Sequence, residues 1–304
     1  MKANLKPLVL MLSLIALFGF AQDKQISPTL SAIFDAERAF AKRCGEVGIR
    51  ASFTEFFVDD GIAFFPQPVK YKEAVKDRPA PPNPLAYSLV WEPVFGDVSA
   101  AGDLGYDTGP SVFSDPSNQN NPPRYGFFFS VWKKQTGGNW KVALDIGTDT
   151  KTPYTGSREG RAARAISPKT VEKANVEAEH SALVEAERAF SKISEAEGLM
   201  KAYMQHLSGE ARLHRDGTEP LTTHEEIFAY LSKNPSNRMW QSMFVDVSQS
   251  GDLGYTYGSY ESKATKSLDA STEKGFYARV WKKDQANKWK LVADVAKPAP
   301  PEQK

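Results

Sequence analysis

The hydrophobic residues of this chain follow two periods, and each period occupies its own segments. From Leu30 to Val47 the apolar residues recur at helical spacing, after Ser27-Pro28, which is a typical helix start. A second helical stretch over Ile49–Val58 is expected to end at Asp59-Asp60-Gly61, and Ile62–Phe65 then predicts a short strand. The first part of the chain is therefore predicted to be mainly helical.

From Tyr87 onward apolar and polar residues alternate, which is the period of a β-strand. Turns are expected at Ala100–Gly102 and at Gly137-Gly138. The segments Tyr125–Lys134 and Asn139–Ile146 are rich in aromatic and β-branched residues, which favour strands. Helices followed by antiparallel strands predict an α+β fold in which the helices pack on one face of a curved sheet.

The same plan occurs twice along the chain. The helical block Asp35–Lys42 returns as Glu185–Lys192, an offset of 185 − 35 = 150 residues. Two later blocks return at an offset of 252 − 103 = 149 residues, namely Asp97–Tyr106 as Asp246–Tyr255 and Val131–Lys134 as Val280–Lys283. A period this long indicates a duplicated domain, because solenoid repeats are roughly 20 to 50 residues long.

The repeat divides the chain into two domains with flanking segments. We expect the first domain over 27–148 and the second over 180–297. A linker over 149–179 is expected to end in a helical part, from residue 168, that extends the first helix of the second copy backwards. A signal peptide over 1–21 and a non-helical tail over 298–304 complete the chain.

The first residues have the pattern of an export signal. Lys2 and Lys6 are followed by an apolar run from Pro7 to Phe20, and small residues precede a cleavage point after Ala21. The apolar run is shorter than the roughly 20 residues that a membrane-spanning helix needs. We expect a bacterial protein of the periplasm or cell exterior that does not associate with the membrane after cleavage.

Composition narrows the classes of function. The formal net charge of +1 over 304 residues gives no reason to expect a nucleic-acid partner. Cys44 is the single cysteine and falls on the apolar stripe of the first helix, so we expect a buried residue and no internal disulfide. The sequence contains no Gly-rich phosphate loop and no nucleophile elbow, so no cofactor is expected. The spacings of His206, His214 and His224 match no metal-ligand pattern, so no metal is expected either.

Two segments of the first copy carry a resemblance to a known family. The first is Trp91-Glu92-Pro93 with the later run Val98–Tyr106, and the second is Gly126–Lys134 followed by Gly138–Val142. Both resemble the SnoaL-like branch of the NTF2-like superfamily, the DUF4440 group. The resemblance covers nearly all of the first copy. In the second copy it covers the first helix and everything from Trp240, and is poor in between.

The resemblance implies a particular architecture and a range of activities. It implies two cone domains, in each of which a strongly bent antiparallel sheet wraps a pocket that helices cap. Relatives use this pocket as ketosteroid isomerases, as polyketide cyclases or dehydratases, or as binding modules. The resemblance also implies a catalytic aspartate near the end of the last strand, as in cyclases of the superfamily. Asp145 occupies that region here.

Asp145 and its counterpart Asp294 are therefore the candidate catalytic residues. Alternation along the last strand puts Asp145 on the face opposite Trp140, Val142 and Leu144. A carboxylate inside an apolar cone has a raised pKa and can accept a proton beside a carbonyl group. The alternative is a strand-end carboxylate that faces solvent or a backbone amide. For the first copy, the candidate hydrogen-bond donors are Tyr71 and Tyr106.

The preceding strand supplies the candidate pocket wall, which contains Phe128, Ser130 and Trp132 in the first copy and Tyr277, Arg279 and Trp281 in the second. The alternative for its aromatic residues is ordinary core packing. An inward Arg279 needs a partner, and Asp294 on the next strand is the most economical one. Such a pair would lower the pKa of Asp294 and argue against its use as a base. Further candidate ligand-binding residues are Phe56, Phe64, Trp91, His206, His214 and Trp240.

The two pockets are not expected to be equivalent, because His206 and His214 replace Phe56 and Phe64. An apolar first pocket and a polar or partly filled second pocket follow from this difference. Other conspicuous residues have simpler interpretations. Asp103 and Asp252 are read as structural residues of hairpin turns, and Glu37-Arg38 and Glu187-Arg188 as solvated ion pairs.

Three classes of function remain open from the sequence. The first is an exported module that binds a small apolar or aromatic molecule in the domain cone without dedicated catalysis. The second is a cyclase or isomerase that uses a pocket aspartate as general base. The third is a structural or partner-binding module with a degenerate second pocket. In each case we expect the copies to pair internally through Phe129, Val131, Ala278 and Val280, as a monomer.

Overall fold

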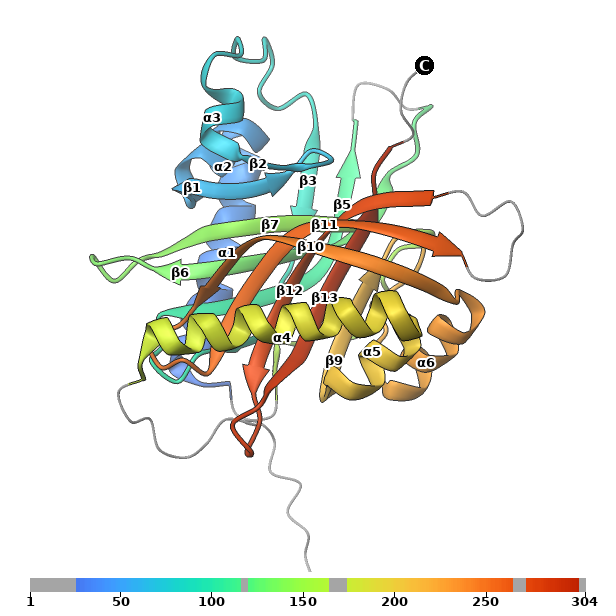
Figure 1. The fold of residues 1–304 in the computed structure, drawn as a ribbon. Helices are drawn as coiled ribbons and strands as arrows, with labels where there is room; N and C mark the ends of the chain where they lie inside the picture. Colours follow the sequence, from blue (N-terminus) through green and yellow to red (C-terminus); the bar gives the residue numbers. More distant parts are fainter. Residues whose placement is uncertain (1–25, 116–119, 164–173, 265–271, 301–304) are drawn as a thin grey trace, which may run out of the picture.

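The structure is a computed structural model that describes residues 26–115, 120–163, 174–264 and 272–300. It is an α+β protein of two domains, each built from helices packed on a strongly curved, mainly antiparallel sheet (Figure 1). The expected signal peptide over 1–21 lies outside the described residues.

The first domain places two consecutive helices before its sheet. The strand order is β2-β1-β7-β6-β5-β4-β8, with β3 also paired to β5, and the pairs β1–β7 and β4–β8 are parallel. Its elements are α1 (Pro28–Val47), α2 (Ile49–Phe56), β1 (Phe57–Phe64), β2 (Pro68–Lys70), α3 (Tyr71–Lys76), β3 (Ser88–Trp91), β4 (Phe95–Val98), β5 (Leu104–Ser114), β6 (Arg124–Lys134), β7 (Trp140–Thr150) and β8 (Arg161–Ala162).

Two local expectations for this domain were wrong. The second helix ends at Phe56 rather than at Asp59-Asp60-Gly61, because Phe57 already pairs with Val142 of β7 and strand pairing overrides the helical pattern. The region expected to be only a linker also contributes structure. Strand β7 continues to Thr150, and β8 adds a short parallel strand beside β4.

The second domain repeats this plan with a five-stranded sheet of order β10-β11-β12-β13-β9. Strand β9 runs parallel to β13, as β1 does to β7, although the sequence resemblance is poor there. Helix α4 begins at Val176 after the cap Asn175, and the helical start expected at residue 168 lies outside the described residues. The elements are α4 (Val176–Glu197), α5 (Leu199–His206), β9 (Leu207–Arg215), α6 (His224–Lys233), β10 (Ser236–Val247), β11 (Leu253–Ala264), β12 (Thr272–Lys283) and β13 (Trp289–Pro298).

A bulge between β6 and β7 changes which residues of β7 share a face. Val131 pairs with Leu144 but the next residue, Trp132, pairs with Val142. Val142 consequently lies in the interior of the first domain, whereas Leu144 lies on the outer face of the sheet. The expectation that these two residues share a face was therefore wrong. Asp145 stays on the inner side, opposite Ser130.

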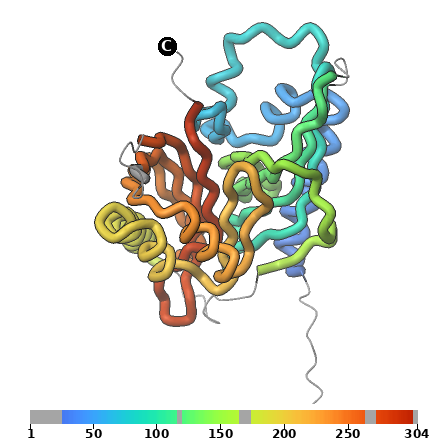
Figure 2. Tube along the Cα trace, turned by 90° about the vertical axis from the view of Figure 1, so that its right-hand side faces the viewer, coloured from blue at the N-terminus to red at the C-terminus, as the bar shows by residue number. Residues whose placement is uncertain are grey.

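The two domains lie side by side (Figure 2). The outer faces of their sheets pack against each other and form a third apolar cluster between the domain interiors. It combines residues of β5, β6 and β7 with residues of β11, β12 and β13. The residues expected at such a contact belong to it, namely Phe129, Val131, Ala278 and Val280. The two copies therefore bury the outer faces of their sheets against each other.

Polar contacts between the domains come in reciprocal pairs. The Lys282 ammonium lies 2.5 Å from an Asp97 carboxylate oxygen, and the equivalent Lys133 lies 2.6 Å from Asp246. The hairpin turns behave alike, since the Gln249 amide donates to Asp103 and the Ala100 amide donates to Asp252. Such reciprocity is the mark of an isologous contact, as in a twofold-symmetric dimer.

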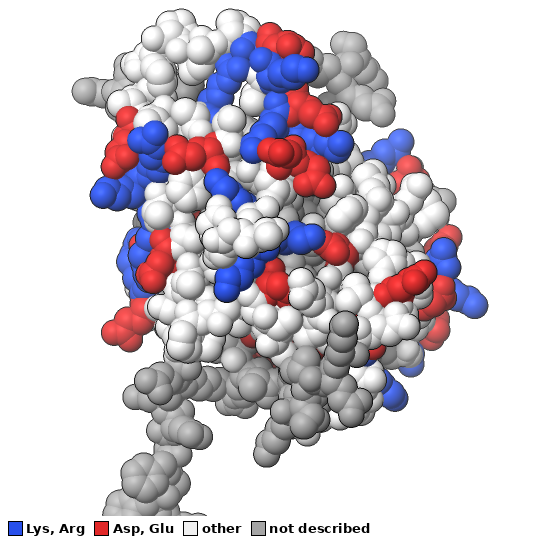
Figure 3. Space-filling model, turned by 90° about the vertical axis from the view of Figure 1, so that its left-hand side faces the viewer, with Lys and Arg blue, Asp and Glu red and all other residues white. Residues whose placement is uncertain are grey.

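The molecular surface carries charges of both signs. On the face drawn in Figure 3, basic and acidic side chains lie among one another, with uncharged surface between them. Among the described residues, no helix is both long and apolar enough to cross a membrane.

Candidate functional site

The interior of the first domain contains a carboxyl group contributed by its first helix. Ile33, Glu37, Phe40 and Cys44 follow each other at helical spacing on the buried face of α1. Glu37 is fully buried as a result, and its expected role in a solvated ion pair with Arg38 was wrong. Glu187 is likewise buried in the second domain.

Glu37 accepts hydrogen bonds from two indole groups. The Trp91 Nε1 group donates to Glu37 Oε1, and Trp132 Nε1 donates to Glu37 Oε2 at 3.0 Å. Trp132 Nε1 also lies 3.1 Å from Asp107 Oδ1. The indole side chains expected as pocket wall or core thus serve as donors to buried carboxyl groups.

Asp107 and Asp145 complete a cluster of three carboxyl groups, which we call the acid trio with Glu37. Asp107 is fully buried on β5, opposite Ser130 of β6. The Ser130 hydroxyl donates to Asp145 Oδ2 at 2.9 Å. Within the described part of the chain, none of the hydrogen bonds or ion pairs of the trio comes from Lys, Arg or His.

The environment of the trio disfavours negative charge. Burial raises the pKa of Asp145 to about 7, the charge of Glu37 adds to this rise, and the Ser130 hydrogen bond opposes it. Burial also raises the pKa of Glu37, while burial and the charge of Glu37 hold the pKa of Asp107 well above its usual range. Three neighbouring carboxylates, two of them fully buried, cannot all ionise without a cation, so the trio holds protons at neutral pH.

The two inner members and the outer member of the trio differ in accessibility. No donor among the described residues faces Asp107 Oδ2, so the protonated form of Asp107, which donates to Glu37, best satisfies this oxygen. Glu37 and Asp107 are fully buried. Asp145 is closely surrounded by protein atoms but keeps part of its side chain accessible. Asp145 is therefore the most accessible member of the trio.

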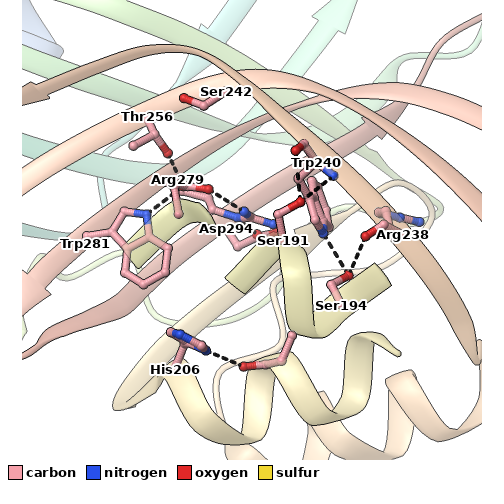
Figure 4. A network of polar contacts seen from close by, with 12 residues as sticks. Ser191, Ser194, His206, Arg238, Trp240, Ser242, Thr256, Arg279, Trp281 and Asp294 are labelled. Carbon is pink, nitrogen blue, oxygen red and sulfur yellow. Dashed lines mark hydrogen bonds and ion pairs between the residues drawn. The ribbon is translucent and has the colours of Figure 1, made fainter. Parts of the chain in front are cut away.

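The second domain has cations beside its buried carboxyl groups, whereas no cation among the described residues contacts the acid trio. Arg279 stands at the position of Ser130, and its Nε lies 2.6 Å from Asp294 Oδ2 while its Nη1 lies 2.9 Å from Glu187 Oε2 (Figure 4). Arg215 reaches Asp294 Oδ1 from β9 at 2.6 Å. The position of Asp107 is taken by Thr256, whose hydroxyl donates to Glu187. Two carboxylates are thus matched by two guanidinium groups.

These cations lower the pKa of Asp294, whereas the pKa of the equivalent Asp145 is raised. Burial opposes ionisation of Asp294, but the charges of Arg215 and Arg279 overcome it and lower its pKa to about 2. The predicted pairing of Arg279 with Asp294, and its effect on the pKa of Asp294, are confirmed. Asp294 is permanently ionised near neutral pH and has no function as a base there.

The structure separates the two expected tyrosine donors from Asp145. Tyr106 precedes Asp107 on β5, so it lies on the opposite face of the sheet, in the cluster between the domains. Its expected place in the pocket was wrong. Tyr71 lies in the interior of the first domain, but its hydroxyl donates to the Arg50 carbonyl oxygen at 3.2 Å.

The replacement of Phe64 by His214 does not distinguish the two pockets as expected. Phe64 and His214 both lie on the outer faces of their sheets, where Phe64 contacts Tyr257 and the His214 ring packs against Phe129. Alternation along β1 and β9 is the reason, since the preceding residue of each strand points inward. His214 is buried, and desolvation lowers its pKa to about 3.

The remaining expected wall residues lie inside the domains. Phe56, Trp91, Phe128 and Trp132 pack in the interior of the first domain. Trp240, Tyr277 and Trp281 pack in the interior of the second domain, and the Arg279 guanidinium lies over the Trp240 ring. The partly buried His206 sits between Phe190 and Trp281 and contacts the Ala202 carbonyl oxygen. The expected apolar character of the first interior was wrong, because the acid trio lies in it.

Sequence reasoning missed Glu37 and Asp107. A signal for Glu37 was present, because Glu37 falls on the same helical stripe as Phe40 and Cys44. A signal for Asp107 was its place next to Tyr106, on the face that Ser130 shares across the strand pair. Among the described residues, no group of His, Cys, Asp and Glu has the arrangement of a metal site.

No family model matches the chain, and no curated protein matches it. Similar solved structures include a conserved protein from Planctomyces limnophilus, with 11% identity, a TM-score of 0.35, and coverage of 41% of this chain and 99% of that one.

Two further structures have comparable values. An NTF-2-like protein of unknown function from Shewanella oneidensis has 16% identity and a TM-score of 0.32, over 38% of this chain and 97% of that one. A ketosteroid isomerase-like protein from Erwinia carotovora has 10% identity and a TM-score of 0.34, over 40% of this chain and 98% of that one. Values this low assign no activity to this chain.

Proposed function

We propose that the first domain binds a small molecule with an apolar or aromatic body and transfers a proton at Asp145. The observation that carries this proposal is the acid trio, which no cation of the described residues contacts, although two cations occupy the same place in the second domain. Buried groups with unbalanced charge reduce stability, so their presence beside an accessible carboxyl group favours a functional role. The interior of the second domain, where ion pairs match the carboxylates, has a structural role.

The chemistry follows from the protonation of the trio. With a pKa of about 7, Asp145 is ionised in about half of the molecules at neutral pH and can accept a proton from carbon adjacent to a carbonyl group. The electron pair of the broken C–H bond forms an enolate. The Asp145 carboxylic acid then returns the proton to the same or another carbon, which regenerates the carboxylate. The Ser130 hydroxyl holds Asp145 in place.

The wider identity of the protein is part of the proposal. We infer a tandem member of the SnoaL-like, DUF4440 branch of the NTF2-like superfamily, exported to the periplasm or cell exterior after loss of residues 1–21. The repeated hairpin motifs and the export pattern support this inference. Binding without catalysis is the second candidate, and the aromatic residues around the trio favour it, including Phe128 beside Trp91.

Exchange of carbon-bound hydrogen tests the two candidates without a known substrate. Enolisable aromatic and alicyclic ketones are incubated in D2O with the full protein, and deuterium uptake is followed by NMR. We expect exchange that Asp145→Asn reduces by roughly 10²-fold or more, the usual share of a general base. Asp149→Asn, an exposed position on the same strand, is the matched control and should keep the wild-type rate.

The outcomes separate the hypotheses. Ketones that bind the wild type and Asp145→Asn equally, with no exchange above the buffer rate in either, support binding without catalysis. Equal exchange in both proteins contradicts a role of Asp145 as base.

A further inference from the structure

A cleft of about 740 Å³ lies on the second domain between helix α4 and strand β10. Trp240 is part of its wall, together with the apolar side chains of Val184, Met243 and Phe244. Met243 is 53% exposed and Phe244 is 38% exposed, so this apolar surface is open to solvent. The volume is in the range of roughly 300 to 1,000 Å³ that small-molecule sites occupy.

Hydrogen bonds fasten α4 to β10 on both sides of the cleft. Ser191 Oγ bonds the backbone N–H and C=O of Trp240, each at 3.0 Å. Further along the strand, the His180 ring lies 3.2 Å from the Val245 carbonyl oxygen. Between these points the pairing of β10 with β11 shifts at Met243, which forms a bulge. These hydrogen bonds fix the position of α4 relative to β10.

In the first domain, an ion pair joins the first helix to the residue just beyond β3, at the position equivalent to the cleft. Arg38 of α1 contacts Glu92 Oε1, just beyond β3, with its Nε at 2.7 Å. The equivalents are Arg188, since 188 − 38 = 150, and Gln241, since 241 − 92 = 149. Gln241 offers no carboxylate, and Arg188 instead pairs with Glu185 on its own helix at 2.6 Å. The second copy has thus lost the ion pair that spans this position in the first.

Charged side chains of both signs line the cleft, and its cations come from α4. His180, Arg188 and Lys192 line it from α4, and among the described residues Lys192 has no ion pair. Glu187 also lines the cleft, but Arg279 neutralises it at 2.9 Å. Glu195 is the remaining acidic group of the wall.

We propose that this cleft is a second binding site, for a small molecule that combines an apolar body with an anionic group such as a carboxylate or sulfonate. The apolar body would lie on Trp240, Met243 and Phe244. The anionic group would lie toward Arg188 and Lys192 on α4. The site is independent of the acid trio, since it belongs to the other domain and opens between a helix and an edge strand.

Titration of the full protein with 8-anilinonaphthalene-1-sulfonate, an anionic apolar fluorophore, tests the site. We expect saturable binding of one probe at the cleft. Lys192→Glu should weaken it at least 10-fold, since it reverses a charge at the wall. Gln241→Glu should weaken it similarly, because it gives Arg188 the partner that Arg38 has. Lys42→Glu, the exposed equivalent of Lys192 on α1, should leave the affinity unchanged.

Three results would overturn the proposal. The first is the absence of saturable binding to the wild type. The second is an equal loss of affinity in Lys42→Glu and Lys192→Glu, which indicates a general charge effect. The third is equal affinity for uncharged N-phenyl-1-naphthylamine in all variants and no preference of the wild type for the anionic probe. Circular dichroism of each variant serves as the control for a retained fold.

Discussion

At the scale of single residues, the exchange of Ser130 for Arg279 separates the chemistry of the two copies. A hydroxyl beside Asp145 leaves a carboxyl group with a pKa of about 7, whereas a guanidinium beside Asp294 holds the pKa at about 2. The backbone pairing is the same in both copies, since Ser130 faces Asp145 and Arg279 faces Asp294. The difference therefore comes from the side chains and not from the fold.

Removal of Arg279 should destabilise the protein strongly. Arg279→Ser copies the residue of the first domain but leaves Glu187 with no ion pair and Asp294 with Arg215 alone. Breaking a buried ion pair in this way costs about 3–5 kcal/mol. Urea unfolding measures the loss, and Arg188→Ser, on the exposed face of α4, should change stability by less than about 0.5 kcal/mol. A loss below about 1 kcal/mol for Arg279→Ser would contradict the structural role of the network.

Asp145 should make stability fall as pH rises. Its pKa is raised in the folded state, from 3.8 to about 7, so the folded protein binds a proton that the unfolded chain releases between these values. The contribution of Asp145 to the free energy of unfolding is highest below about pH 4. It decreases between about pH 4 and about pH 7 and is constant at higher pH. Asp145→Asn removes the effect and should gain on the order of 1–3 kcal/mol relative to wild type between pH 4.5 and 8, allowing for partial solvent screening.

Urea unfolding of the wild type and of Asp145→Asn, at about pH 4.5 and at about pH 8, gives this difference directly. Asp149→Asn serves as control because Asp149 is exposed on the same strand. A variant whose stability follows that of the wild type at both pH values would show that Asp145 titrates normally.

At the scale of elements, the strands and turns of the duplicated plan could be predicted from periodicity. The boundaries that failed are those set by partners far away in sequence. Phe57 is a strand residue because β7 lies beside it, and Leu144 changes face because of a bulge that pairing with β6 creates. The acid trio could not be assembled from sequence for the same reason. Its members come from α1, β5 and β7, and only packing brings them together.

The reciprocal lysines between the domains provide a matched comparison of two environments. Lys282 and Asp97 are nearly buried, whereas the equivalent Lys133 and Asp246 are partly exposed. Lys282→Ala leaves a buried carboxylate unpaired and should cost about 3 kcal/mol, while Lys133→Ala should cost at most about 1 kcal/mol. Thermal unfolding of both variants at neutral pH compares them, and equal losses would contradict this account of the interface.

At the scale of the whole molecule, the contact between the two domains determines which sheet surfaces remain available to another chain. The outer faces of both sheets are already covered, with Val131 and Val280 in the shared cluster. We therefore predict a monomer. Light scattering of the full protein at micromolar concentration should give the mass of one chain, and a stable dimer or tetramer would contradict the prediction.

The pairing also allows the two interiors to diverge while one interface holds them together. One interior keeps protonated carboxyl groups, and the other is closed by ion pairs that include Arg279. We propose that the first interior serves proton transfer and the second serves structural support.

The most direct test of this claim is a pH titration of the two aspartate carboxyl carbons by NMR in the full protein. Asp145→Asn and Asp294→Asn serve to assign the two signals. The account predicts that the Asp145 carboxyl titrates with a midpoint near 7 and that the Asp294 carboxyl remains ionised down to about pH 2. An Asp145 midpoint below about 4, the usual value for an exposed aspartate, would contradict it.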